Sequence, residues 1–186
     1  MLLDKCSGGR RILWSDGRAN QLNRQRGSVE LYFETQAQDY QKKCQCWPWK
    51  WLRNREARSV ITMLDDIGGR SSLEFGCGAG FYSRLLLEAG ADHVWALDLS
   101  SRMLDQLPAH HITPILGDAA EIQIERQFDR AFSAGLLEFV SDPAKVLANL
   151  AGHVLAGGVA TVLFPVANIA GFLYRFYHCR HGMFLN

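Results

Sequence analysis

The stretch 71–80, SSLEFGCGAG, places a carboxylate two positions ahead of alternating glycines. Gly76 and Gly78 allow backbone angles and a close ligand approach that a Cβ would prevent. Glycine turns after an apolar strand commonly hold phosphates, but Glu74 would repel a phosphate and attract a cation. The pattern predicts a ligand that needs both a close backbone approach and a nearby negative charge.

A second carboxylate, Asp98, closes the apolar segment 93–99, about 20 residues after the glycines, which is where such folds bind the ribose hydroxyls of a nucleotide. The spacing is G-x-G-x-G, and Phe81 stands where the dinucleotide fingerprint has its third glycine. A nicotinamide-dependent oxidoreductase is therefore disfavoured. A nucleoside that carries positive charge, S-adenosylmethionine, satisfies both carboxylates.

The elements that must position these residues follow from the pattern after Gly69. Short apolar runs alternate with helical segments, which predicts an α/β fold with a doubly wound, mostly parallel, Rossmann-like sheet. Ligands of such sheets bind at the carboxyl ends of the strands. The expected strands are 71–75, 93–99, 113–118, 128–135 and 159–164, and the expected helices are 81–90, 102–107, 144–155 and 167–180.

The residues before the sheet, 1–68, do not show this alternation of strands and helices. Residues 1–27 are polar and rich in arginine, and we expect them to form a flexible basic arm. Residues 28–186 are expected to form a single domain, in which helices within 28–68 lie over the cofactor site and 69–186 form the α/β core. The second of these helices is expected to run from Pro48 toward Gly68, with one shared face: Leu52, Val60, Met63, Leu64 and Ile67.

Composition and charge restrict the class of protein. The formal net charge is +1, which disfavours a large surface for polyanions, so we expect no nucleic-acid partner. The five cysteines lack the paired spacing of a zinc site, and we interpret them as free thiols of a cytoplasmic protein without a bound metal.

One long uncharged stretch, 154–174, satisfies the length test for a membrane helix. Gly157, Gly158 and Pro165 divide it into a helix end, a strand and a new helix start, which favours a buried strand over a membrane span. Contact with a membrane surface is the disfavoured alternative.

Four segments in order, LEFGCGAG, ALDLS, GDAAEI and FDRAFSAGLLEFVSDP, resemble the signature segments of class I S-adenosylmethionine-dependent methyltransferases over about residues 55–170. The resemblance implies a methyltransferase fold, methyltransferase activity and S-adenosylmethionine as cofactor. The residues that it places at the cofactor are Tyr40, Glu74, Gly76, Cys77, Gly78, Asp98, Leu99, Asp118, Ala119 and Ser133.

The same resemblance implies a role for each residue. Glu74 and the turn from Gly76 to Gly80 would meet the methionine end, and Asp98 the ribose hydroxyls. Leu99, Asp118 and Ala119 would meet adenine, Ser133 the reacting end, and Tyr40 would lie over the cofactor. Three alternatives stay open: Gly80 serves packing only, Asp118 is a helix cap, and Cys77 is a small turn residue and not a nucleophile.

The acceptor of the methyl group is inferred by elimination and by analogy with the family that the chain resembles. The segment SAGLLE after the fourth strand lacks the motif used on nucleobase or glutamine amines, which leaves a small-molecule acceptor. The aromatic stretches CQCWPWKWLR and GFLYRFYHCRHGMF indicate an apolar or lipid-like acceptor if they are exposed, and sheet packing if they are not. No catalytic residue is assigned; Glu138 is placed suitably for a base but is interpreted as a surface glutamate.

The expected sheet departs from the family in one respect. Family members usually end in a strand hairpin, whereas only MFLN follows Gly182, so the fifth strand would be an exposed edge. Truncation, a short sheet, or a dimer or other partner chain over this edge would each explain it. The alternative to an active enzyme is a catalytically silent subunit that binds S-adenosylmethionine or a partner chain.

Overall fold

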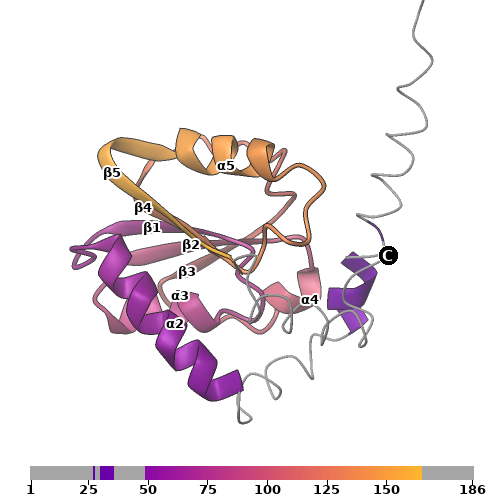
Figure 1. Cartoon of the computed structure of the whole chain (residues 1–186), viewed down its shortest axis with the longest axis horizontal. Coiled ribbons are helices and arrows are strands. Elements are labelled where there is room, and N and C mark those ends of the chain that lie inside the picture. Colours follow the sequence, from indigo (N-terminus) through magenta and orange to yellow (C-terminus); the bar gives the residue numbers. More distant parts are fainter. Residues whose placement is uncertain (1–26, 28–29, 36–48, 165–186) are drawn as a thin grey trace, which may run out of the picture.

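The computed structural model describes residues 27, 30–35 and 49–164, and the statements below refer to these residues. Five strands form one parallel sheet in the order β3-β2-β1-β4-β5 (Figure 1). The predicted parallel α/β sheet is confirmed. Its strands are β1 (Ser71–Phe75), β2 (His93–Asp98), β3 (Ile112–Leu116), β4 (Phe128–Ala134) and β5 (Val154–Leu163).

Helices cover both faces of the sheet, as a doubly wound fold requires. In Figure 1, α2 (Trp49–Leu64) and α3 (Phe81–Glu88) lie on one side of the strands, and α5 (Pro143–Gly152) lies on the other. The short α4 (Ser101–Leu104) follows β2, and residues 30–35 are also helical. The predicted arm before residue 27 and the predicted helix 167–180 lie outside the described residues.

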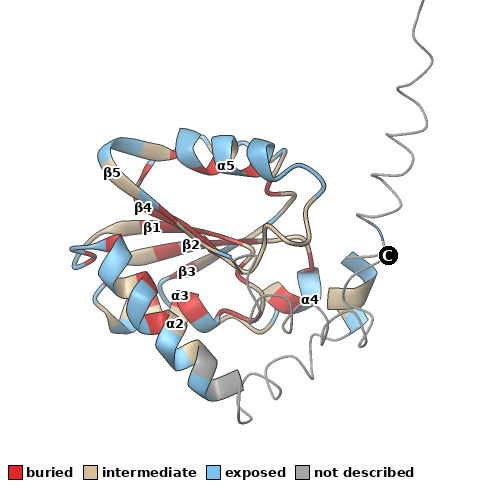
Figure 2. Cartoon of the chain, viewed as in Figure 1, coloured by how far each residue is buried: buried red, intermediate tan, exposed pale blue. Residues whose placement is uncertain are grey.

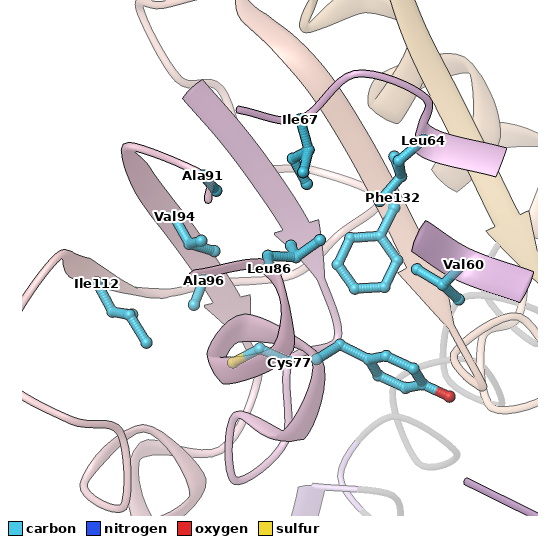
Figure 3. Packing of buried hydrophobic residues seen from close by; sticks show 11 residues of the cluster. Val60, Leu64, Ile67, Cys77, Leu86, Ala91, Val94, Ala96, Ile112 and Phe132 are labelled. Carbon is cyan, nitrogen blue, oxygen red and sulfur yellow. The ribbon is translucent and has the colours of Figure 1, made fainter. Parts of the chain in front are cut away.

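Two apolar clusters hold these layers together. Between the sheet and α2 and α3 lie Val60, Leu64, Leu86, Val94 and Phe132 (Figure 3). On the α5 side lie Leu73, Phe75, Phe128, Val146 and Leu150. The buried residues of the helices face the strands and the exposed ones face outward (Figure 2). The central strands β1 and β4 are buried on both faces and therefore need nearly continuous apolar sequence, which makes them recognisable.

Helix α2 ends at Leu64, four residues before the predicted end at Gly68. Asp65 has a φ of 57° and breaks the helix. Met63, predicted on the buried face, is 54% exposed, whereas Val60 and Leu64 are fully buried. The prediction for Met63 is therefore wrong, because the buried face of α2 follows a narrower stripe than the apolar sequence does.

The pair Gly157–Gly158 does not end a helix but lies within β5. Phe128 pairs with Val154 and Arg130 with Val159, so the extra residues of β5 form an irregularity here. Gly157 has a φ of 82°, and a Cβ on Gly158 would lie 2.7 Å from a backbone carbonyl oxygen of β4. The two glycines thus permit a bulge. No helix of the described residues is long and apolar enough to cross a bilayer.

A buried arginine connects the end of α2 to the sheet. Arg130 in β4 is 6% exposed, and its guanidinium donates to the carbonyl oxygens of Leu64 (2.6 Å) and Asp66 (2.8 Å). It also donates to the backbone carbonyl oxygen of its neighbour Asp129 at 2.9 Å. The last carbonyls of a helix have no partner within the helix, and Arg130 supplies one.

Substituting Arg130→Met should lower the free energy of unfolding by about 2–4 kcal/mol, because buried carbonyls lose a charged donor. Urea unfolding measures the change. Arg58→Gln on the exposed side of α2 is the control, with an expected change within about 0.5 kcal/mol. Equal effects of the two substitutions would show that the Arg130 contacts do not stabilise the fold.

Candidate functional site

The glycine turn after β1 meets the end of β2. The amide N–H groups of Gly76 and Cys77 both donate to the carbonyl oxygen of Leu97, at 2.8 and 2.9 Å. The N–H of Gly78 donates to Oδ2 of Asp98 at 2.7 Å. Gly76 and Gly78 have φ values of 75° and 51°, which favour glycine. The structure therefore brings the predicted turn and the predicted carboxylate into direct contact.

Gly80 has a packing role. It has a φ of 78° at the start of α3, and a Cβ there would lie 2.3 Å from Cδ2 of Leu107. Arg84, one turn into α3, donates to the carbonyl oxygens of Ala79 (2.6 Å) and Gln106 (2.7 Å). Arg84 and the packing of Leu107 thus hold the glycine turn against the segment after α4.

Glu74 lies in β1, beneath the turn, and is 1% exposed. The hydroxyl of Ser83 in α3 donates to its Oε2. Burial raises the pKa of Glu74 from 4.5 to about 8; the Ser83 hydrogen bond opposes this rise and the charge of Asp98 adds to it. Ser83 was not predicted, although a hydroxyl among the apolar residues of FYSRLLLE is a signal for a buried polar partner.

Asp98 accepts a second hydrogen bond, from the N–H of Ser100 to Oδ1 at 3.0 Å. Burial raises the pKa of Asp98, and the hydrogen bonds from Ser100 and Gly78 oppose this. Ser100 also caps α4, since its Oγ accepts from the N–H of Met103 at 3.2 Å. Of the two adjacent serines that could cap this helix, Ser100 and Ser101, the structure uses Ser100.

Residues 30–35 dock against this end of the sheet. Glu34 accepts a hydrogen bond from the Ser100 hydroxyl at 2.8 Å, and its other oxygen lies 3.2 Å from Nε of Arg102. Phe33 packs against Ala79 and Met103. Glu34 was missed because its partners lie more than sixty residues away and no local pattern marks the pairing.

Asp118 and Ala119 follow β3, which runs beside β2. The carboxylate of Asp118 accepts from the N–H of Ala120 at 2.9 Å and closes a turn, since no helix follows. Its role as a helix cap is therefore excluded. The side-chain amide of Asn149 in α5 donates to the carbonyl oxygen of Ala119 at 2.9 Å and fixes this turn.

Ser133 lies beside Phe75 in the sheet register, and its hydroxyl donates to the Phe75 carbonyl oxygen at 2.9 Å. Leu99 is half-buried directly after β2. Cys77 is 5% exposed, and burial raises the pKa of its thiol. A protonated, buried thiol favours a turn residue over a nucleophile.

Most of the predicted site residues thus meet at the carboxyl ends of β1, β2, β3 and β4, and Tyr40 lies outside the described residues. Glu138, interpreted from the sequence as a surface residue, has carboxylate oxygens that are buried. Within the described ranges, no cluster of three or more histidine, cysteine or acidic side chains could hold a metal.

Comparison with known proteins gives a match to a family model. Residues 73–162 match the family described as methyltransferase domain. A crystal structure of an S-adenosylmethionine-dependent methyltransferase from Mesorhizobium loti superposes with a TM-score of 0.52 and 27% identity, over 62% of this chain and 52% of that one.

Two curated relatives are similar over part of the chain. A tRNA U34 carboxymethyltransferase of Idiomarina loihiensis is 32% identical over 123 residues, which is 59% of this chain and 35% of the relative. A malonyl-[acyl-carrier protein] O-methyltransferase of Serratia marcescens is 36% identical over 113 residues, 58% of this chain and 43% of the relative. The chain thus spans less than half the length of either relative.

These relatives correct the prediction of the partners of the chain. The sequence analysis expected no nucleic-acid partner and a small-molecule acceptor, but several relatives are named for tRNA and one for a carrier protein. The exclusion was wrong because it was based on the net charge of the whole chain, which averages over local basic segments.

Glu74→Gln should reduce the pH dependence of stability. Because the folded protein holds the Glu74 proton more tightly, stability from this carboxyl is complete below about pH 4.5 and is lost as pH rises toward 8. The slope of unfolding free energy against pH should therefore be less negative in the variant, by up to about 1.4 kcal/mol per pH unit.

Urea unfolding between about pH 5 and about pH 8 measures this slope. Glu88→Gln, on the exposed side of the same helix as Ser83, is the control and should keep the wild-type slope. Asp98, whose pKa is also raised, contributes a slope of the same sign in all three proteins. Identical slopes for wild type and Glu74→Gln would contradict the assignment.

Proposed function

Because residues 73–162 form a domain of the class I S-adenosylmethionine-dependent methyltransferase family, we propose that the chain binds S-adenosylmethionine at the carboxyl end of β1 and transfers its methyl group. The observation that carries this proposal is the contact of Asp98 with the glycine turn, directly above the buried Glu74.

The residues fit the cofactor chemically. The Asp98 carboxylate accepts hydrogen bonds from the backbone of Gly78, Ser100 and Leu99, and a carboxylate has about four lone-pair sites, so it can still accept from a ligand. Two neighbouring ribose hydroxyls can donate to these two oxygens. The positive φ values of Gly76 and Gly78 shape the turn that would meet the methionine end, and the Leu136 side chain packs on the Cβ side of Gly76.

Glu74 distinguishes this ligand from a dinucleotide. A pyrophosphate above a buried acid would be repelled once the acid ionises, whereas the ammonium and sulfonium of S-adenosylmethionine would be attracted. The buried position strengthens both effects, since water screens charges less there.

The remaining roles are part of the same proposal. Leu99 would contact adenine, Asp118 its exocyclic amine and Ala119 its edge. Ser133 would lie near the reacting end, Cys77 would contribute its backbone, and Tyr40 would cover the cofactor. Residues 30–35 would form the N-terminal element over the site, since Glu34 docks beside Asp98.

S-adenosylmethionine, when bound, supplies a methyl group activated by a positively charged sulfur. The contribution of the chain is to hold the cofactor by Asp98 and the turn, to exclude water with the apolar residues around Phe33, and to orient the acceptor in line. Glu138, which follows β4 with its carboxylate oxygens buried, is a candidate to receive a proton from the acceptor.

The acceptor class is the open part of the proposal. The relatives are named for a tRNA and for a malonyl group on a carrier protein, and these are different chemistries. The expectation of an apolar acceptor from sequence stays a prediction. Methyl transfer is therefore tested against three classes separately: unfractionated tRNA, malonyl-acyl carrier protein and a small-molecule extract.

The full chain should transfer label from methyl-labelled S-adenosylmethionine to one of these three classes, and Glu138→Gln should slow this transfer more than it weakens cofactor binding. Cofactor binding without transfer to any class would support the silent-subunit alternative. Binding of NAD in competition with S-adenosylhomocysteine would contradict the proposal.

Asp98→Ala should weaken binding of S-adenosylhomocysteine by about 10-fold to 100-fold, because hydrogen bonds to a charged acceptor contribute about 1.5–3 kcal/mol. Titration calorimetry measures the affinity. Asp105→Ala removes an exposed carboxylate just after α4 and should leave the affinity unchanged. An unchanged affinity in Asp98→Ala would remove the ribose assignment.

A further inference from the structure

The outward side of α2 carries a basic and aromatic surface that the proposed cofactor site does not use. We call the exposed residues of this helix the α2 outer face (Figure 2). None of them is acidic, since Glu56 is half-buried and bound to Arg53 and the Tyr82 hydroxyl. The face consists of Trp51, Asn54, Arg55, Arg58, Ser59, Thr62 and Met63.

The charges of this face are not neutralised. Within the described ranges, no ion pair involves Arg55 or Arg58. The guanidinium of Arg55 lies over the ring of Trp51, 5.8 Å from its centre, and Trp51 is 58% exposed. Exposed arginines beside an exposed aromatic ring offer both phosphate contacts and a stacking platform.

The sequence around the face is strongly basic. Residues 42–58 contain one acidic residue, Glu56, and six basic ones: Lys42, Lys43, Lys50, Arg53, Arg55 and Arg58. The net charge of +1 for the whole chain conceals this local excess. A polyanion responds to the local charge, not to the total.

The pattern favours RNA over a lipid surface. The apolar residues of the face, Trp51 and Met63, are twelve positions apart, which is about 18 Å along the helix. Polar and basic side chains occupy the space between them, whereas a helix that lies in a membrane needs a continuous apolar side. Unpaired RNA bases stack on aromatic rings, and duplex DNA does not offer its bases in this way.

The N-terminal half of α2 contacts the start of α3, close to the proposed site. Arg53 donates to the hydroxyl of Tyr82 at 3.2 Å, and Tyr82 lies in the first turn of α3, two residues after Gly80. A polymer held on this half of α2 would lie next to the glycine turn. We propose that the α2 outer face binds the RNA that carries the methyl acceptor, an inference that rests on the proposed methyltransferase function.

Fluorescence anisotropy with labelled, unfractionated tRNA and the full chain tests the proposal between about 50 and about 200 mM salt. Arg55→Gln and Arg58→Gln should each weaken binding several-fold and reduce the slope of log affinity against log salt by roughly 0.7–0.9. Trp51→Ala should weaken binding by at least about fivefold through lost stacking.

Arg126→Gln is the matched control. Arg126 is exposed and lies over Trp95, 4.1 Å from the ring centre, in the cluster on the α5 side of the sheet. The Arg126→Gln variant should bind tRNA with the affinity of the wild type. Equal weakening in Arg126→Gln, equal competition by duplex DNA, or no binding of tRNA by the wild type would overturn the proposal.

Two further measurements separate the alternatives. If wild type binds vesicles of phosphatidylcholine with about 30% phosphatidylserine and not tRNA, and the α2 variants lose this binding, the face is a membrane surface and the proposal fails. All α2 variants should bind S-adenosylhomocysteine like the wild type. Failure of the wild type to bind S-adenosylhomocysteine, with tRNA binding intact, would reject the methyltransferase function and not the RNA surface.

Discussion

Three hydrogen bonds join the turn after β1 to the end of β2, and the one that reaches a side chain runs from the N–H of Gly78 to Asp98 at 2.7 Å. It can form because the parallel register pairs Phe75 with Leu97, so β1 and β2 end at the same level. The turn after β1 must then fold back over the end of β2, and only residues that accept a positive φ can do this. The sheet register, the glycines and the carboxylate therefore depend on one another.

Three carboxylates gather at this end of the sheet, and each has its own partner. Glu74 is bound by Ser83, Asp98 by two backbone amides, and Glu34 by Ser100 and Arg102. The charge of Glu34 contributes to the raised pKa of Asp98. A cationic nucleoside favours the ionised form of acidic groups gathered in this way, and the docking of residues 30–35 is part of the electrostatics of the site.

Features written in short stretches of sequence were predictable. The strands and the glycine turn each follow from a few adjacent residues. Features that depend on distant partners were not predictable. Arg130 donates to the carbonyl oxygen of Leu64, 66 residues earlier, and the glycines of β5 are needed because β4 passes close by. A bulge and a helix end use the same residue type, so local sequence could not separate them.

The buried acid of β1 has a consequence for selectivity. At neutral pH a carboxyl with a pKa of about 8 is mostly uncharged, so Glu74 by itself offers little attraction to sodium, magnesium or free amines. A ligand that brings its own fixed cation against this group must expel the proton to gain the full Coulombic attraction. Binding of the ligand would then release a proton to solvent, and the affinity for the ligand would fall at low pH.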